Sequence, residues 1–107
     1  MQVPEAQGRI ITCILPKGEG LSIVKALHEK GITRANVAFA RGFDIHDQDD
    51  EKKGFPVEVE KEIVTIIAKD QSEGDELFDF VFEEGNINRL GGGLMFMSKL
   101  SGSVPYL

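Results

Sequence analysis

Two short segments of this chain are apolar at odd and even positions alike, residues 10–15 and residues 63–67. Successive side chains of a β-strand point to opposite faces of its sheet, so a strand of this kind needs cover on both faces. Leaving one face in water would cost roughly 25 cal/mol per Å² of exposed apolar area. The pattern therefore predicts a sheet whose two faces are both buried.

The predicted elements follow in the order strand, helix, strand, strand, helix, strand. Right-handed crossovers place both helices on the same side of such a sheet. We therefore expect one α+β domain over 1–107, a ferredoxin-like βαββαβ sandwich with a four-stranded antiparallel sheet and two helices on one face. Two helices leave the other apolar face open, so copies of the chain are expected to associate. The strands are expected at about 8–15, 37–43, 57–68 and 94–99.

The spacing of apolar residues predicts which side of each helix is buried. The first helix is expected to end at Gly31, a residue type that commonly terminates helices. The second is expected to begin with Ser72, which stands three residues before Asp75 in a weak form of the capping box. The stripes expected to face the sheet are Leu21, Val24 and Leu27 in the first helix and Leu77, Phe80 and Val81 in the second.

The composition is that of a soluble globular protein, and it argues against some partners. The 107 residues carry a formal net charge of −6, whereas binding to nucleic acid relies on clustered Lys and Arg. No apolar stretch has the length of a membrane span and no signal peptide is visible, so we expect a cytoplasmic protein. Cys13 lies in the first apolar segment and is expected to be a small core residue, and His28 to lie at the surface.

Three consecutive glycines, Gly91 to Gly93, separate the second helix from the last strand. Glycine accepts positive φ and lacks a Cβ atom, so successive N–H groups of such a segment can converge on an anion. The alternative interpretation is a flexible connector. Between residues 44 and 56 the apolar pattern disappears and acidic residues dominate, which predicts a long charged loop.

The order of the elements is combined here with the Gly31-Ile32-Thr33 turn, the Gly42-Phe43 pair and the stretch 90–96. In these features the sequence resembles the PII nitrogen-regulatory signalling proteins, and more particularly their divergent PII-like relatives. The resemblance covers about residues 8–98. It implies a homotrimer whose sheets face one another around a central axis, with adenine-nucleotide sites between subunits. It also implies that 44–56 is the T-loop, which an effector controls and which regulates a membrane transporter or an enzyme.

The resemblance also implies which residues bind the effector. The family's Gly-Asp-Gly-Lys loop corresponds to residues 91–94, which lack the Asp and the Lys, and the family's tail arginines have no counterpart in 101–107. Fewer cations favour an effector with less charge than ATP, such as ADP, AMP, a cyclic nucleotide or bicarbonate. Because 44–56 contains no Tyr, uridylylation is not expected. From the resemblance, the expected effector-binding residues are Asn36, Gly42, Phe43, Gly91, Gly92 and Gly93. Arg41 and Arg89 lie next to the two retained loops and are expected to replace the missing cations.

Two other functions stay open at this point. His46 lies in an acidic run, and a His with carboxylates can bind a divalent metal. The CutA family has a similar trimeric sandwich, so a CutA-like metal-binding or metal-tolerance trimer is the alternative. A small dimeric α+β barrel enzyme is the third option, with a substrate pocket on the open sheet face. No Ser/His/Asp, Cys/His or HExxH arrangement is readable, so we expect neither catalysis nor a required cofactor.

Overall fold

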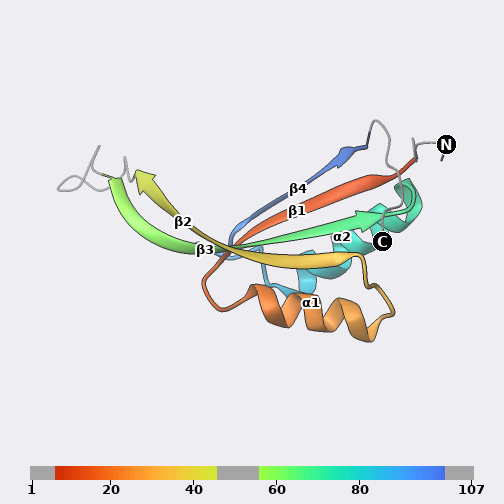
Figure 1. Cartoon of the computed structure of the whole chain (residues 1–107), viewed down its shortest axis with the longest axis horizontal. Coiled ribbons are helices and arrows are strands. Elements are labelled where there is room, and N and C mark those ends of the chain that lie inside the picture. Colours follow the sequence, from red (N-terminus) through yellow and green to blue (C-terminus); the bar gives the residue numbers. More distant parts are fainter. Residues whose placement is uncertain (1–6, 46–55, 101–107) are drawn as a thin grey trace.

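The computed structural model describes residues 7–45 and 56–100, and it shows four strands with two helices on one side (Figure 1). The elements are β1 (Arg9–Pro16), α1 (Gly20–Glu29), β2 (Ala35–Ile45), β3 (Pro56–Ala68), α2 (Gln71–Glu84) and β4 (Leu94–Lys99). The strands form one antiparallel sheet in the order β2-β3-β1-β4. The predicted ferredoxin-like βαββαβ fold is confirmed.

β2 is longer at both ends than the sequence pattern predicts, and β3 begins one residue earlier, at Pro56. They pair continuously from Ala35 opposite Ile66 to Ile45 opposite Pro56. The apolar pattern had faded there, but backbone hydrogen bonds between strands do not depend on apolar side chains. In Figure 1 the paired ends of β2 and β3 run well beyond the helices. The expected loop at 44–56 is thus shorter at both ends, and its central part, 46–55, lies outside the described residues.

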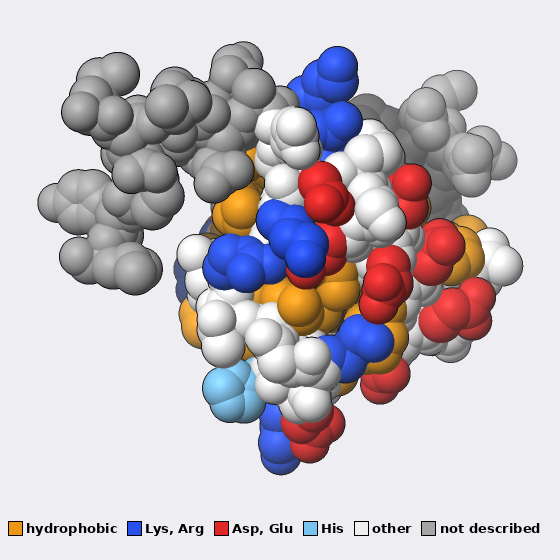
Figure 2. All heavy atoms as spheres, turned by 90° about the vertical axis from the view of Figure 1, so that its right-hand side faces the viewer, with side chains coloured by type: hydrophobic (Ala, Val, Ile, Leu, Met, Phe, Trp, Pro, Cys, Tyr) orange, Lys and Arg blue, Asp and Glu red, His pale blue; other side chains and the backbone are white. Residues whose placement is uncertain are grey.

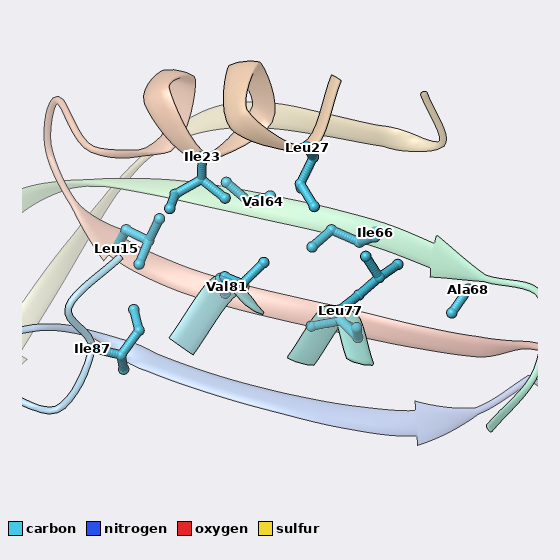
Figure 3. Close-up of a cluster of buried hydrophobic side chains, with 11 residues drawn as sticks. Leu15, Ile23, Leu27, Val64, Ile66, Ala68, Leu77, Val81 and Ile87 are labelled. Atoms are coloured by element: carbon cyan, nitrogen blue, oxygen red, sulfur yellow. The ribbon is translucent and has the colours of Figure 1, made fainter. Parts of the chain in front are cut away.

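The core lies between the sheet and the two helices. Figure 3 shows Ile23 and Leu27 of α1, with Leu77 and Val81 of α2, pointing toward the side chains of the strands. Alternate residues of β1 and β3 meet them from the sheet, as a period of two requires. The buried hydrophobic residues are Ile11, Cys13, Leu15, Ile23, Leu27, Val64, Ile66, Ala68, Leu77, Val81 and Ile87.

Two details of the predicted helices are wrong. Leu21 is 64% exposed, because the glycine before it, Gly20, is the residue of the first turn that packs on the sheet. The cap of α2 is Asp70 and not Ser72, since the Asp70 carboxylate accepts a 2.8 Å hydrogen bond from the N–H of Glu73. The helix therefore begins two residues earlier than the capping box suggested.

The face of the sheet opposite the helices is apolar and has no helix over it. Ile14 of β1 lies between Ile63 of β3 and Leu94 of β4 in the strand register. Leu94 is 58% exposed and Phe96 is 47% exposed. This open face consists of Ile10, Thr12 and Ile14, of Ile63, Thr65 and Ile67, of Asn36 and Ala38, and of Leu94 and Phe96.

The end of the molecule where β3 passes into α2 has a different character. Seen from that end, acidic and basic side chains lie close together, with hydrophobic side chains in small areas between them (Figure 2). Arg34 donates a 2.8 Å hydrogen bond to Glu73 here. Within 7–45 and 56–100, neither helix is long and apolar enough to cross a membrane.

Glu62 is the buried charged side chain among the described residues, and it holds the start of α1. Its two carboxylate oxygens accept hydrogen bonds of 2.6 Å from the N–H groups of Gly18 and Gly20. The residue at the N-cap position, Glu19, makes no side-chain capping bond. The Glu62 carboxylate, which comes from β3, therefore caps the N-terminus of α1 in place of a local side chain, and it stabilises the turn between β1 and α1.

Replacing Glu62 by Ala is expected to lower the free energy of unfolding by about 3 kcal/mol, because two hydrogen bonds to a charged group are lost. Urea denaturation at neutral pH measures this. The control is Glu58→Ala, an exposed acidic residue of the same strand, with an expected change below about 0.5 kcal/mol. Equal losses in the two variants would contradict the capping role.

Candidate functional site

The triple-glycine loop is closely packed against the end of β1. Gly91 and Gly93 have φ values of +76° and +118°. A Cβ atom on Gly93 would lie 2.5 Å from the carbonyl oxygen of Ile14, and one on Gly92 would lie 2.5 Å from that of Ile87. Gly92 and Gly93 are thus required by close backbone approach, whereas the position of a Cβ on Gly91 is open.

Arg89 anchors this loop to the turn before α1. Its Nη1 donates to the carbonyl oxygens of Gly85 at 3.0 Å and Asn86 at 2.9 Å, near the C-terminal end of α2. Its Nη2 donates to both carboxylate oxygens of Glu19, at 2.8 and 2.6 Å. The Arg89 guanidinium lies beside the glycine loop, and the carboxylate of Glu19 is already hydrogen-bonded to it.

The alternation of β2 divides the other expected effector residues between two faces. Asn36 and Gly42 belong to the face that lacks helices. Arg41 and Phe43 belong to the helix-side face, where their partners on β3 are acidic. The structure brings Gly91 to Gly93 together with Arg89, but it does not bring these two pairs of β2 residues onto one surface.

A groove lies on the helix-side face of β2 and β3, next to the turn after β1. Lys17 Nζ lies 2.6 Å from Glu60 Oε2, and Arg41 Nη2 lies 3.6 Å from Glu60 Oε1. The hydrogen bond and charge of Lys17 lower the pKa of Glu60, and Glu60 in turn raises the pKa of Lys17. This helix-side groove, of about 320 Å³, is lined by Lys17, Phe39, Ala40, Arg41, Glu60, Lys61 and Glu62.

Lys17, Phe39 and Glu60, which line this groove, were not among the residues expected from the sequence to bind a ligand. The readable signal was a period of two in β3, where Glu58, Glu60 and Glu62 share one face. That pattern is also typical of an ordinary solvated strand, and the partners on β2 depend on a register that the sequence does not state.

The histidines and the cysteine can be placed only in part. Within 7–45 and 56–100, no group of three or more His, Cys, Asp and Glu side chains is arranged to hold a metal ion. His46 lies outside these ranges, and His28 is exposed at the end of α1, as expected. Cys13 is buried in the core, as expected, and burial raises the pKa of its thiol from 9.0 to about 11.

The raised pKa of Cys13 predicts a loss of stability at alkaline pH. The folded chain holds the thiol proton more tightly than the unfolded chain, so stability is constant below about pH 8 and falls as pH rises from 9 toward 11. The expected loss at pH 10.5 is about 2 kcal/mol. Urea unfolding at pH 8 and pH 10.5 should show a smaller difference for Cys13→Ala. Identical differences for both proteins would contradict the prediction.

No family model and no curated protein matches this sequence. Solved structures match it in three dimensions. The complex of B. subtilis GlnK with ATP superposes with a TM-score of 0.72 at 13% identity, covering 92% of this chain and 86% of that one. B. subtilis GlnK gives 0.70 at 12% identity, with 92% and 89% covered.

A plant protein gives a similar result. Arabidopsis thaliana PII bound to citrate superposes with a TM-score of 0.66 at 19% identity, covering 90% of this chain and 77% of that one. All three likenesses extend over most of the chain, while the identities stay below one residue in five. The resemblance found in the sequence is therefore confirmed at the level of structure: the chain has the fold of the PII and GlnK proteins.

Proposed function

We propose that this chain is a non-enzymatic, PII-like signal-transduction protein that works as a cytoplasmic homotrimer. The observation that carries the proposal is the open face, to which β1, β3 and β4 contribute large apolar side chains although both helices lie on the other side. Three copies that turn this face toward a common axis remove it from water. The shared fold with GlnK and plant PII supports this arrangement.

The effector site lies in the clefts between copies. The glycine loop precedes β4, while Asn36 and Gly42 lie on β2, and these are the two edge strands of the sheet. Two strands separate these groups within one chain. In a ring of copies the β2 edge of one chain meets the β4 edge of the next, so that both groups line one cleft.

The chemistry of this cleft favours a small effector of modest charge. Gly91 has free space around its Cα atom, and Arg89 supplies a fixed cation beside it. A strong triphosphate site would need further cations in the loop, where Leu94 stands. GlnK was solved with ATP and plant PII with citrate, which supports a small anionic effector such as an adenine nucleotide or bicarbonate.

Effector binding is coupled to partner choice through β2. This strand contributes Asn36 and Gly42 to the cleft and continues directly toward the segment 46–55. Binding that favours one arrangement of β2 therefore changes which conformations of that segment are populated. The partner is a membrane transporter or a metabolic enzyme that this segment contacts.

Calorimetric titration of the full chain with ATP, ADP, AMP, cyclic AMP and bicarbonate tests the effector. At least one nucleotide with fewer charges than ATP is expected to bind more tightly than ATP. Heats no larger than those of buffer mixing across the whole panel would refute the proposal.

Glu19→Gln is expected to tighten binding of the best anion at least about threefold, because Glu19 then no longer competes for the Arg89 guanidinium. Arg89 keeps its position through its bonds to two backbone carbonyls. The matched control is Glu29→Gln at the other end of α1, which should leave the affinity unchanged. If Glu19→Gln and the unsubstituted protein bound this anion with equal affinity, Arg89 would not be part of the effector site.

A further inference from the structure

Phe39, Arg41 and Phe43 lie on the helix-side face of β2 at a place that no helix covers. α1 begins only at Gly20, and the β2–β3 hairpin continues beyond it (Figure 1). Phe39 is consequently 74% exposed and Phe43 is 66% exposed. Two exposed aromatic rings, one before and one after an arginine on the same strand face, form a surface suited to a ligand with a flat ring.

The helix-side groove gives this surface a defined shape. Its volume of about 320 Å³ is at the lower end of the range in which proteins bind small molecules. Phe39 and Arg41 come from β2, Glu60 comes from β3, and Lys17 comes from the turn after β1. Three separate parts of the chain therefore converge on one concave site.

The exposed charges of the groove favour an anion. The carboxylate of Glu60 lies between Lys17 and Arg41 and neutralises only one of these two cations. Glu62 is buried and both of its oxygens accept backbone N–H groups, but its negative charge still acts on Lys17. Among the residues that line the groove, three are basic, Lys17, Arg41 and Lys61, and two are acidic, Glu60 and Glu62. One positive charge therefore remains here, on a chain whose formal net charge is −6.

We propose that the helix-side groove is a second binding site, for a planar aromatic ring that carries a carboxylate or phosphate group. The ring stacks on Phe39, and the anionic group replaces the Glu60 carboxylate between Lys17 and Arg41. This site is separate from the effector cleft, since Asn36 and Gly42 belong to the opposite face of β2.

Titration of the ¹⁵N-labelled full chain with indole-3-acetate tests the proposal, because this probe combines a flat ring with a carboxylate. Backbone amide shifts are expected to concentrate at residues 17, 39–41 and 60–62. Indole alone and acetate alone are each expected to bind at least about fivefold more weakly. Phe39→Leu should weaken binding of the whole probe by at least about fivefold. Glu60→Gln should tighten it by at least about twofold, because the competing carboxylate is gone.

The matched control is Phe96→Leu, the same substitution on the open face, which should leave the affinity within about twofold. The proposal is overturned if no amide shifts appear, if they concentrate at 91–93, or if Phe96→Leu weakens binding as much as Phe39→Leu. A weaker affinity of Glu60→Gln would overturn it as well. Because the probe is not a nucleotide and its location is mapped, a failure of the nucleotide panel leaves this test unaffected.

Discussion

An Ile63→Asp variant is expected to be a folded monomer in solution, whereas the unsubstituted protein is expected to be a trimer. Ile63 lies on the open face, opposite Ile14 of β1 and Ala38 of β2 in the strand register. Between packed copies its replacement by Asp would bury a charge without a partner, which costs about 3–5 kcal/mol. In the separate chain the same carboxylate meets water, because no helix covers that face, so the fold is retained.

Light scattering coupled to size-exclusion chromatography measures the mass, and circular dichroism checks that the variant is folded. The control is Leu21→Asp, which places the same charge on the exposed side of α1 and should leave the mass at three chains. The trimer would be disproved by an unchanged protein that runs as one chain. A trimeric Ile63→Asp variant would show that another surface holds the copies together.

Gly93→Ala is expected to lower the free energy of unfolding by about 3 kcal/mol or more. The backbone φ of +118° is in a region that residues with a Cβ atom rarely occupy, and the added atom would lie 2.5 Å from the carbonyl oxygen of Ile14. This closest contact is with backbone, which cannot rotate away as a flexible side chain can. Denaturation in urea should show the loss at any protein concentration.

Gly91→Ala is the matched control in the same loop. Its φ of +76° imposes some strain, but no atom lies within 4 Å of the added Cβ, so the expected loss is only about 1 kcal/mol. Equal losses at the two positions would show that close approach to β1 is not the reason for Gly93. Gly91→Ala also allows the role of the loop in effector binding to be measured in a folded protein, since the added methyl group lies in the free space beside the loop.

Local patterns predicted most of the fold correctly. Apolar residues on both faces of 10–15 and 63–67 indicated a sheet with an uncovered side, and Ile14 and Ile63 lie on that side. The first helix was predicted less well, because its apolar residues fit two neighbouring stripes. Periodicity alone does not decide between them. The contact of Gly20 with the sheet decides which stripe is buried, and it turns Leu21 toward water.

Most of the site could not be predicted, because it depends on contacts between distant parts of the chain. Glu62 and Gly20 are 42 positions apart and meet only when β3 lies beneath the turn before α1. Glu19 and Arg89 are 70 positions apart. The resemblance selected both Arg41 and Gly42, although the alternation of a strand already places these consecutive residues on opposite faces of β2.

The long hairpin has a mechanical consequence. β2 has 11 residues and is paired along its whole length, so at roughly 3.3 Å per residue it forms a stiff arm of about 35 Å. The base of this arm is fixed to the core through Val64 and Ile66, while its far end carries no packed layer beneath it. A tilt of about 5° at the base would therefore move the tip by about 3 Å. A small rotation of the sheet thus becomes a larger displacement at its outer end.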